Sequence, residues 1–159
     1  MQNGKGADLR SVLLLCVAEE VEAMGGLEAR CKGQTLEVDV DSTLRVLADP
    51  HYLISALSNL VQNAIKYSRK GGAIHVRSRE QGDLVLLEVE DQCGGLPPGK
   101  AEELFRPFTQ MSKDRTGLGL GLTISREAVA LNGGTLSVRD LPGEGCIFTI
   151  SLPKAVVKT

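Results

Sequence analysis

Aromatic residues are scarce in this chain of 159 residues, which contains two Tyr, three Phe and no Trp. Stacking of nucleic-acid bases on aromatic rings therefore has few candidate platforms. The formal net charge of −2 also argues against broad electrostatic binding to nucleic acid or to an acidic lipid surface. We therefore expect neither nucleic acid nor a membrane among the direct partners.

Long apolar runs and metal-binding motifs are missing as well. The longest apolar run, residues 12–18, is far shorter than the roughly 20 residues that span a bilayer, and the N-terminus lacks the features of a signal peptide. The four cysteines are widely spaced without a CxxC pair, and two histidines are too few for a convincing zinc site. These absences favour reduced cysteines and a cytoplasmic location, including the cytosolic part of a membrane-bound parent.

The apolar content, 42% of the residues, is sufficient for one folded domain. A first helix is predicted from a capping Asp8 to about Gly25, where a Gly-Gly pair ends it. A second helix is predicted from Pro50, capped by Asp49, to about Ser68. A third helix is expected at about 118–131, a short one at about 100–105 in a loop-rich stretch, and strands at 35–40, 44–48, 74–79, 85–89, 135–139 and 146–152.

These strands alternate apolar and polar residues, so one face of the sheet is buried and the other is wet. Helices are then needed on the apolar face alone. The predicted fold class is a two-layer α/β sandwich, in which three long helices cover one face of a mixed, mostly antiparallel sheet.

The second predicted helix carries a polar stripe opposite its apolar face. Helical periodicity aligns Asn59, Asn63 and Lys66 along that stripe. Two carboxamides and an ammonium in one line offer oxygen ligands for a hard cation and a donor for phosphate. A solvated helix face explains the same pattern, although asparagine is a poor residue for a helix interior.

A carboxylate stands at the end of the strand predicted at 85–89. Asp91 follows this strand and is itself followed by Gly94-Gly95, which lets backbone approach a flat ligand closely. The exocyclic amino group of adenine fits such an acceptor, whereas guanine presents an oxygen there. An ordinary turn with an aspartate cap is the alternative.

A glycine-rich stretch, Thr-Gly-Leu-Gly-Leu-Gly-Leu from residue 116, leads into the third long helix. Glycines at a helix start expose N–H groups, and the positive end of the helix dipole favours phosphate. The chain contains no P-loop motif and no Ser/Thr/Tyr-kinase signature, and the glycine spacing differs from that of the dinucleotide-binding fingerprint. Taken alone, the stretch is also compatible with a glycine-rich hinge.

The order of these motifs resembles the N, G1, F and G2 boxes of sensor histidine kinases. The chain reads Asn-x-x-x-Asn-Ala-x-Lys-Tyr from residue 59, Asp-x-x-Gly-Gly from 91, Leu-Phe-x-Pro-Phe from 104 and the glycine-rich stretch from 116. Residues 142–148 look like the last glycine box before the closing strand. The resemblance covers about residues 8–152 and implies the ATP-binding catalytic domain of a two-component kinase, with the Bergerat fold of the GHKL superfamily.

The resemblance also implies roles for individual residues. Asn63 would bind Mg²⁺, with Asn59 close to the metal, and Lys66 would reach phosphate, so these three form the implied catalytic set. Asp91 would take the adenine amino group and Gly95 would lie against the base. The other implied nucleotide-binding residues are Tyr67, Gly117, Leu118, Gly119, Leu120, Gly121 and Thr149.

Two positions depart from the family pattern. Cys93 stands where the first glycine of the G1 box usually lies, which puts a left-handed backbone there in doubt. The lid implied over the phosphates, about residues 109–116, is short and lacks the usual glycine pair. Both departures favour the alternative of a degenerate nucleotide-binding scaffold that signals by docking.

Asn59 distinguishes the branches of the superfamily. Relatives that hydrolyse ATP usually carry glutamate there as a general base, whereas asparagine cannot take a proton. The resemblance therefore implies a protein-histidine kinase with ATP and Mg²⁺ as cofactors, and disfavours the third possibility, a hydrolase.

The family's phospho-acceptor motif, a histidine followed by an acid and then a proline, is missing around both His51 and His75. We therefore expect an excised catalytic domain over 8–153, with a flexible segment at 1–7 and a tail at 154–159; a separate kinase acting in trans is the alternative. Its expected partners are the dimerisation and phospho-acceptor domain of the parent kinase and, indirectly, a response regulator receiver domain.

Overall fold

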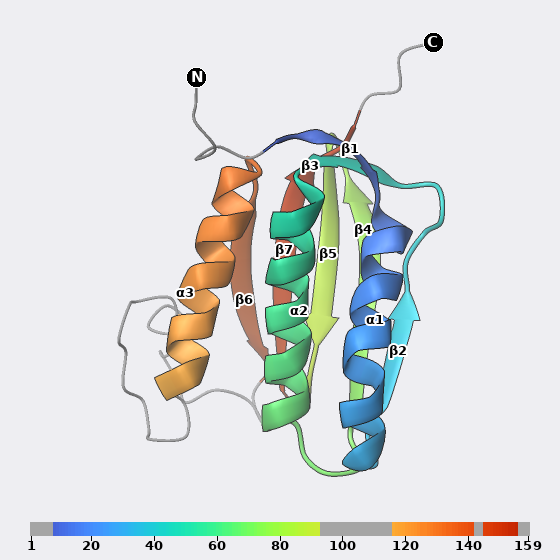
Figure 1. Ribbon diagram of the computed structural model, residues 1–159, viewed down its shortest axis with the longest axis vertical. Coiled ribbons are helices and arrows are strands. Elements are labelled where there is room, and N and C mark those ends of the chain that lie inside the picture. Colours follow the sequence, from blue (N-terminus) through green and yellow to red (C-terminus); the bar gives the residue numbers. More distant parts are fainter. Residues whose placement is uncertain (1–7, 93–115, 142–144, 156–159) are drawn as a thin grey trace.

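The computed structural model describes residues 8–92, 116–141 and 145–155. Within these ranges, α1 (Leu14–Cys31), α2 (Pro50–Tyr67) and α3 (Thr116–Leu131) cover one face of a five-stranded sheet (Figure 1). The sheet order is β2 (Thr35–Asp39), β4 (Ala73–Gln81), β5 (Leu84–Glu90), β7 (Gly145–Pro153) and β6 (Thr135–Leu141). β2 and β4 are parallel and the other neighbours are antiparallel. The predicted two-layer α/β sandwich with a mixed, mostly antiparallel sheet is confirmed.

The main core lies between the helix layer and the sheet. Its largest fully buried side chains come from α1, α2, β3, β4, β5 and β7; they are Leu14, Val46, Leu53, Leu57, Leu60, Ile65, Ile74, Leu87, Ile150 and Leu152. A separate antiparallel pair, β1 (Arg10–Leu13) and β3 (Arg45–Ala48), crosses the upper end of the domain in Figure 1. No helix in the described part of the chain is both long and apolar enough to cross a membrane.

The helix α2 begins and ends close to the predicted residues. The Asp49 carboxylate accepts the His51 N–H at 3.0 Å, and Pro50 occupies the first turn, where its missing N–H costs nothing. A second Asp49 oxygen accepts the Asp8 N–H at 2.8 Å, and the Asp49 N–H donates to Asn132 Oδ1 at 2.9 Å. Asp49 therefore joins the start of α2 to the N-terminal segment and to the end of α3.

Replacing Asp49 by alanine is expected to lower the free energy of unfolding by about 1 kcal/mol at neutral pH, the usual cost of a lost N-cap. Burial alone would raise the pKa of Asp49, but backbone N–H donors, led by those of Asp8 and His51, outweigh burial and lower this pKa below its ordinary 3.8. A carboxyl with a lowered folded pKa stabilises the fold above its unfolded pKa, and that contribution is lost as the pH falls through the folded pKa.

The matched variant Asp49→Asn keeps an accepting oxygen but does not ionise. We expect the difference in unfolding free energy between wild type and Asp49→Asn, from urea titrations, to be present at about pH 6 and to be smaller at about pH 3. A difference of equal size at both pH values would contradict the role of the ionised carboxylate.

The prediction for the first helix is wrong at both of its ends. Residues 10–13 form β1, because they pair with β3 from Arg10↔Ala48 to Leu13↔Arg45, and α1 begins only at Leu14. α1 then continues through Gly25 and Gly26 to Cys31. Gly25 is buried against Val61 and Ile65 of α2, so this glycine permits close helix packing and does not end the helix.

Replacing Gly26 by alanine is expected to raise the unfolding free energy by about 0.5–1 kcal/mol, because glycine inside a helix loses more backbone entropy than alanine. A Cβ at Gly26 would meet nothing within 4 Å. At Gly25 the same atom would lie 3.3 Å from Ile65 Cδ1 and 3.4 Å from Val61 Cγ1, so Gly25→Ala should gain less or lose stability. Urea denaturation compares the two variants, and a Gly25→Ala protein at least as stable as Gly26→Ala would contradict the tight contact.

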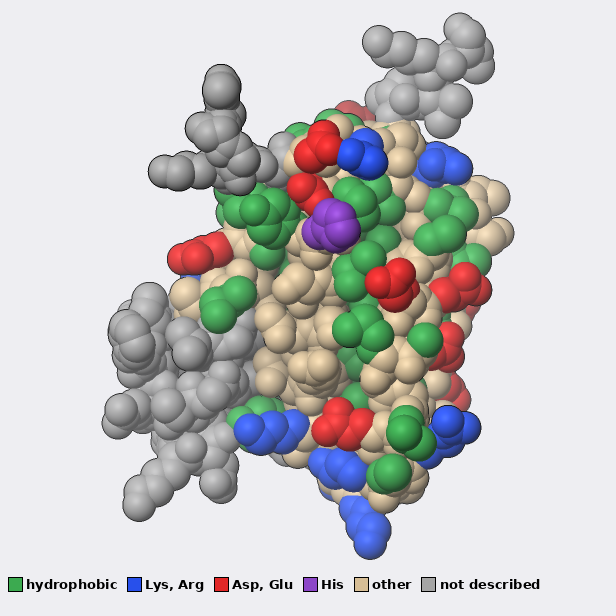
Figure 2. Space-filling view, viewed as in Figure 1, with side chains coloured by type: hydrophobic (Ala, Val, Ile, Leu, Met, Phe, Trp, Pro, Cys, Tyr) green, Lys and Arg blue, Asp and Glu red, His purple; other side chains and the backbone are tan. Residues whose placement is uncertain are grey.

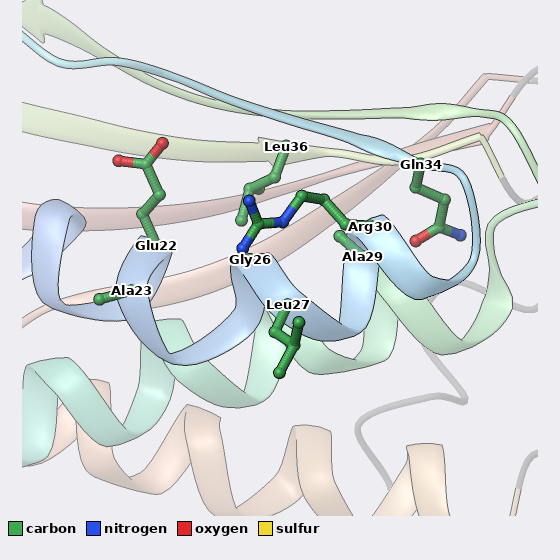
Figure 3. A pocket seen from close by; sticks show the side chains of 8 residues that line it. All are labelled: Glu22, Ala23, Gly26, Leu27, Ala29, Arg30, Gln34 and Leu36. Atoms are coloured by element: carbon green, nitrogen blue, oxygen red, sulfur yellow. The ribbon is translucent and has the colours of Figure 1, made fainter.

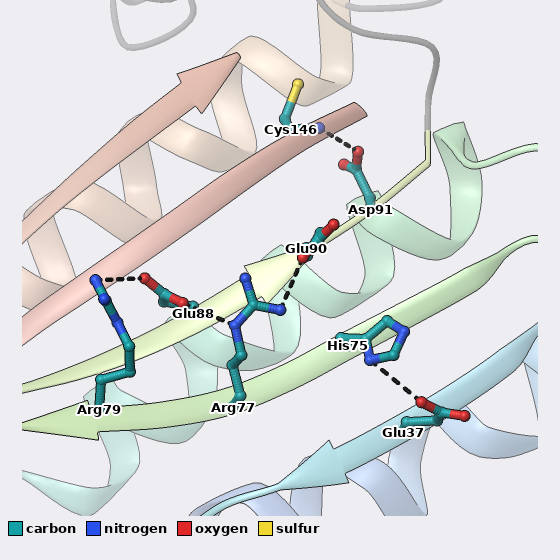
Figure 4. A network of polar contacts seen from close by, with 8 residues as sticks. All are labelled: Glu37, His75, Arg77, Arg79, Glu88, Glu90, Asp91 and Cys146. Atoms are coloured by element: carbon teal, nitrogen blue, oxygen red, sulfur yellow. Dashed lines mark hydrogen bonds and ion pairs between the residues drawn. The ribbon is translucent and has the colours of Figure 1, made fainter. Parts of the chain in front are cut away.

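The face of the sheet away from the helices is less wet than predicted. Glu88 is only 4% exposed, because Arg77 Nε and Arg79 Nη2 from the neighbouring strand lie 2.9 Å and 3.1 Å from its carboxylate oxygens (Figure 4). Arg77 also donates to Glu90 at 2.7 Å. Burial alone would lower the pKa of Arg77, but its hydrogen bonds to Glu90 and Glu88 outweigh burial and raise that pKa. This paired network holds β4 against β5, the strand that leads to Asp91.

Candidate functional site

Four elements meet at one end of the domain, the lower end in Figure 1. α2 and β5 end there, whereas α3 and β7 begin there. The meeting follows from chain direction, since β7 runs antiparallel to β5 and α3 packs beside α2. The structure thereby brings the end of the asparagine helix, the strand-end carboxylate and the start of the glycine-rich helix to the same end of the molecule.

The predicted polar stripe of α2 faces away from the core. Asn59 and Asn63 are half-buried and Lys66 is exposed, whereas the opposite side of the helix is buried. Tyr67, the last residue of α2, packs against the hydrophobic core, and Lys66 Nζ lies 5.2 Å from the centre of its ring. The carboxamides and the ammonium therefore form one accessible row that ends beside a partly buried aromatic ring.

Asp91 is buried, at 5% exposed, and bonded to the start of β7. Its N–H donates to the Cys146 carbonyl oxygen at 2.9 Å, and its Oδ1 accepts the Cys146 N–H at 3.0 Å (Figure 4). In a regular antiparallel pair the second bond would go to the backbone carbonyl of residue 91. Here the carboxylate takes that bond, so the backbone of β7 orients the Asp91 side chain.

Gly145 makes this arrangement possible by the absence of a side chain. A Cβ at Gly145 would lie 2.0 Å from the Asp91 carbonyl oxygen and 3.0 Å from Gln92 Cα. Such distances are far inside van der Waals contact, so only glycine lets β7 approach the end of β5 this closely.

Ser68 and Gln92 connect the end of α2 to the segment after β5. The Gln92 N–H donates to Ser68 Oγ at 3.0 Å, and the Arg69 N–H donates to the Gln92 carbonyl oxygen at 3.3 Å. The Gln92 side chain in turn accepts the Ala73 N–H at 2.7 Å. The residues following Asn63 and Lys66 are thus hydrogen-bonded directly to the residue that follows Asp91.

The glycine-rich stretch begins α3 at Thr116, slightly before the predicted start at about 118. Gly117 falls among the first N–H groups of the helix, which have no partner within it, whereas Gly121 lies more than one turn inside. The start of α3 therefore offers backbone donors and the positive end of a helix dipole at the same end of the molecule as Lys66. Leu118, Gly119 and Leu120 belong to this first part of the helix.

Thr149 is not brought to this end of the molecule. It pairs with Glu88 on one side and Ser137 on the other, in the middle of β7. Successive residues of a strand point to opposite faces, and the neighbours of Thr149, Phe148 and Ile150, belong to the core. Thr149 therefore lies on the sheet face away from the helices.

Several predictions fall outside the described residues. They concern Cys93, Gly95, the short helix at about 100–105, the Leu-Phe-x-Pro-Phe motif from 104 and residues 109–115 of the implied lid.

Several residues of this region did not stand out as site residues from the sequence. Gly145 and Cys146 belong to the last glycine box, so the box itself was a usable signal for them. Ser68 and Gln92 carry no motif, and their contacts with the site depend on long-range pairing that residue patterns do not reveal.

A metal ion here would depend on carboxamide and phosphate oxygens. Among residues 8–92, 116–141 and 145–155, no group of three or more His, Cys, Asp and Glu side chains could hold a metal. Asn63 and Lys66, with Glu28, Lys32 and Gln62, line a cavity of about 490 Å³ between α1 and α2. Figure 2 shows Lys and Arg side chains gathered at the lower end of this face, the end where the exposed Lys66 lies. The gathered cationic side chains suit an anionic ligand that brings its own oxygen ligands for a cation.

The chain belongs to the histidine kinase-, DNA gyrase B- and HSP90-like ATPase family, whose model matches residues 48–156. Its relatives are sensor histidine kinases. The alginate biosynthesis sensor protein KinB of Pseudomonas aeruginosa is 39% identical over 126 residues, which cover 79% of this chain and 21% of KinB. The sensor histidine kinase GlrK of Escherichia coli is 34% identical over 158 residues, covering 97% of this chain and 33% of GlrK. The chain therefore spans about a fifth to a third of the length of these two relatives.

Solved structures agree with this assignment. The catalytic domain of the histidine kinase ThkA superposes with a TM-score of 0.83 at 27% identity, covering 92% of this chain and 96% of that domain. Full-length ShkA in complex with AMPPNP gives a TM-score of 0.85 at 26% identity, covering 99% of this chain and 33% of ShkA. The predicted family, the sensor histidine kinase ATPase domain, is confirmed, and so is its fold.

Proposed function

We propose that residues 8–153 form a catalytic domain that binds Mg-ATP. The domain transfers the γ-phosphoryl group to a histidine on the dimerisation and phospho-acceptor domain of a parent kinase. The observation that carries the proposal is the meeting of the end of α2, Asp91 and the start of α3 at one end of the fold (Figure 1). The complex of ShkA with AMPPNP, an ATP analogue, supports it by similarity.

In the proposed site Asp91 accepts the exocyclic amino group of adenine. Its carboxylate is suited to this because the Cys146 N–H, 3.0 Å away, already fixes its orientation. Lys66 and the N–H groups at the start of α3 donate to the phosphates, with the positive end of the helix dipole in the same place. Recognition of the base and of the phosphates thus comes from separate elements that share one end of the domain.

Asn63, with Asn59 one turn earlier on the same stripe, would hold the magnesium ion. Carboxamide oxygens are hard ligands, and Mg²⁺ usually takes few protein ligands, using substrate phosphates and waters for the rest. Bound there, the ion would neutralise charge on the phosphates during transfer. Asn59 cannot serve as a general base, which disfavours hydrolysis and suits transfer to an imidazole that is already nucleophilic.

The receiving histidine would lie on another domain, since neither His51 nor His75 matches an acceptor motif. A response regulator receiver domain would then take the phosphoryl group in a later step. The solved complex of ThkA with the response regulator TrrA supports this partner by similarity.

Calorimetry of the chain with Mg-ATP, followed by incubation with labelled ATP and the parent's dimerisation domain, tests the proposal. We expect ATP binding that weakens in Asn63→Ala, no steady phosphate release, and acid-labile label on the added domain only. Binding without transfer would favour a docking scaffold, and steady phosphate release would favour a hydrolase. Absence of ATP binding would refute the nucleotide site itself.

A further inference from the structure

The connection between α1 and β2 holds the last carbonyl groups of α2. Gln34 is only 4% exposed, and its Nε2 lies 3.0 Å from the Ile65 carbonyl oxygen, 3.2 Å from that of Ser68 and 3.4 Å from that of Arg69. Lys32 Nζ lies 2.5 Å from the Ile65 carbonyl oxygen and 3.1 Å from that of Lys66. Two side chains from one short connection thus bind four carbonyls at and just beyond the end of α2.

These contacts replace bonds that a helix cannot make for itself. The last four carbonyls of a helix have no partner within it, and a cation near a helix C-terminus is favourable. Backbone hydrogen bonds also link this connection to the segment after α2. The Gly71 N–H donates to the Lys32 carbonyl oxygen at 3.3 Å, and the Thr35 N–H donates to the Gly72 carbonyl oxygen at 3.0 Å. Gly33, with φ of +68°, turns the chain sharply between Lys32 and Gln34.

The orientation of the Gln34 carboxamide follows from its partners. Only its amino group can donate to these carbonyl oxygens, with one of its two N–H bonds shared between two of them, so a flipped side chain would place oxygen against oxygen. Oε1 accepts from no described group, and Gln34 lines a cavity of about 340 Å³ between α1 and β2 (Figure 3). The hydrogen bonds of the Gln34 side chain to the end of α2 therefore come from its amino group, and a neutral side chain without N–H donors removes them.

We propose that Gln34 and Lys32 are positioning residues that hold the end of α2 so that Lys66 and Asn63 meet the phosphates of the nucleotide. The inference rests on the proposed function and deepens it. Lys66 lies within the segment from Ile65 to Arg69, in which four carbonyls are bound, so the direction of its side chain depends on that segment. The same contacts reach Asp91 only indirectly, through Ser68 and Gln92. Loss of the hydrogen bonds from Gln34 and Lys32 should therefore weaken phosphate binding more than adenine binding.

The test compares the dissociation constants of Mg-ATP and AMP for wild type, Gln34→Met and Lys32→Met. Met keeps the length of the Gln side chain, is one atom shorter than Lys, and lacks N–H donors. We expect Gln34→Met to weaken Mg-ATP binding about five- to tenfold, the scale of one net hydrogen bond, and AMP binding less than about twofold. Lys32→Met should likewise lower the ratio of the affinity for Mg-ATP to the affinity for AMP. Lys70→Met, which removes an exposed ammonium at the same end of the domain, is the matched control for charge and should leave the ATP-to-AMP ratio within about twofold.

If Gln34 has a merely structural role, Gln34→Met should lower thermal stability and either weaken the binding of Mg-ATP and AMP equally or leave both unchanged. Either result would overturn the inference. If the ATP-to-AMP affinity ratio falls as far in Lys70→Met as in Lys32→Met, the inference is wrong for Lys32. If wild type binds ATP and the ATP-to-AMP affinity ratio is unchanged in Gln34→Met, the positioning role of Gln34 is refuted and the proposed function stands. A wild-type chain that binds no ATP would refute both.

Discussion

Replacement of Asp91 by asparagine is expected to weaken Mg-ATP binding by about 30- to 100-fold while the domain stays folded. The single carboxamide oxygen of asparagine would accept the Cys146 N–H, as Asp91 Oδ1 does at 3.0 Å. The amino group of the new side chain would then occupy the position of the other carboxylate oxygen. In the proposed site that group faces the exocyclic amino group of adenine, so a donor would meet a donor in a buried place.

Calorimetry with Mg-ATP measures the loss, and urea denaturation checks that the variant is folded. Asp91→Asn should also lose its preference for ATP over GTP, because guanine presents an oxygen where adenine presents the amino group. Thr149→Val is the matched control on β7, since Thr149 lies on the opposite face of the sheet, and its affinity should change less than about twofold. An unchanged affinity in Asp91→Asn, or a comparable loss in Thr149→Val, would show that the base is recognised elsewhere.

Local signals predicted most of the fold correctly. The pair Asp49-Pro50 marks the start of α2 because a capping carboxylate and a proline each have a physical reason to stand there. Period-two alternation located β4 and β5, and the turn between them contains Gly82 with φ of +60°. Each of these signals acts within a few residues, so no knowledge of the rest of the chain was needed.

The errors arose where distant residues decide the outcome. Gly25 looks like a helix stop until Val61 and Ile65 of α2 are known to pack against it. Residues 10–13 carry a pattern compatible with a helix, but β3 was needed to pair with them as a strand. For the candidate site, residue types identified the asparagines, Asp91 and the glycine-rich stretch.

The register of β7 could not be predicted in the same way. Alternation alone does not say which residue of β7 lies opposite Asp91, and a shift of three residues exchanges the two faces of the sheet. The sequence motif suggested Thr149 for the nucleotide site, whereas the observed pairing puts Cys146 beside the carboxylate. The hydrogen bonds of Gln34 could not be predicted either, because the three carbonyl groups that accept them lie more than one element away along the chain.

Replacing Gly145 by alanine is expected to lower the unfolding free energy by about 2–3 kcal/mol and, in protein that remains folded, to weaken Mg-ATP binding at least about tenfold. The new Cβ would lie 2.0 Å from the Asp91 carbonyl oxygen and 2.8 Å from its carbonyl carbon. Backbone atoms cannot turn aside as a flexible side chain does, so β7 must separate from the end of β5. That separation breaks the bond from the Cys146 N–H that orients the carboxylate.

Gly134→Ala is the matched control for the loss of stability. Its Cβ would lie 2.3 Å from the Ser151 carbonyl oxygen and 2.8 Å from Leu152 Cδ2, a backbone clash of the same kind. Gly134 follows α3 at the opposite end of the sheet from Asp91 (Figure 1). We expect a comparable fall in unfolding free energy, with the ATP affinity of the folded fraction within about twofold of wild type. If both variants lost affinity in proportion to stability, the close approach at Gly145 would serve the fold alone and not the orientation of Asp91.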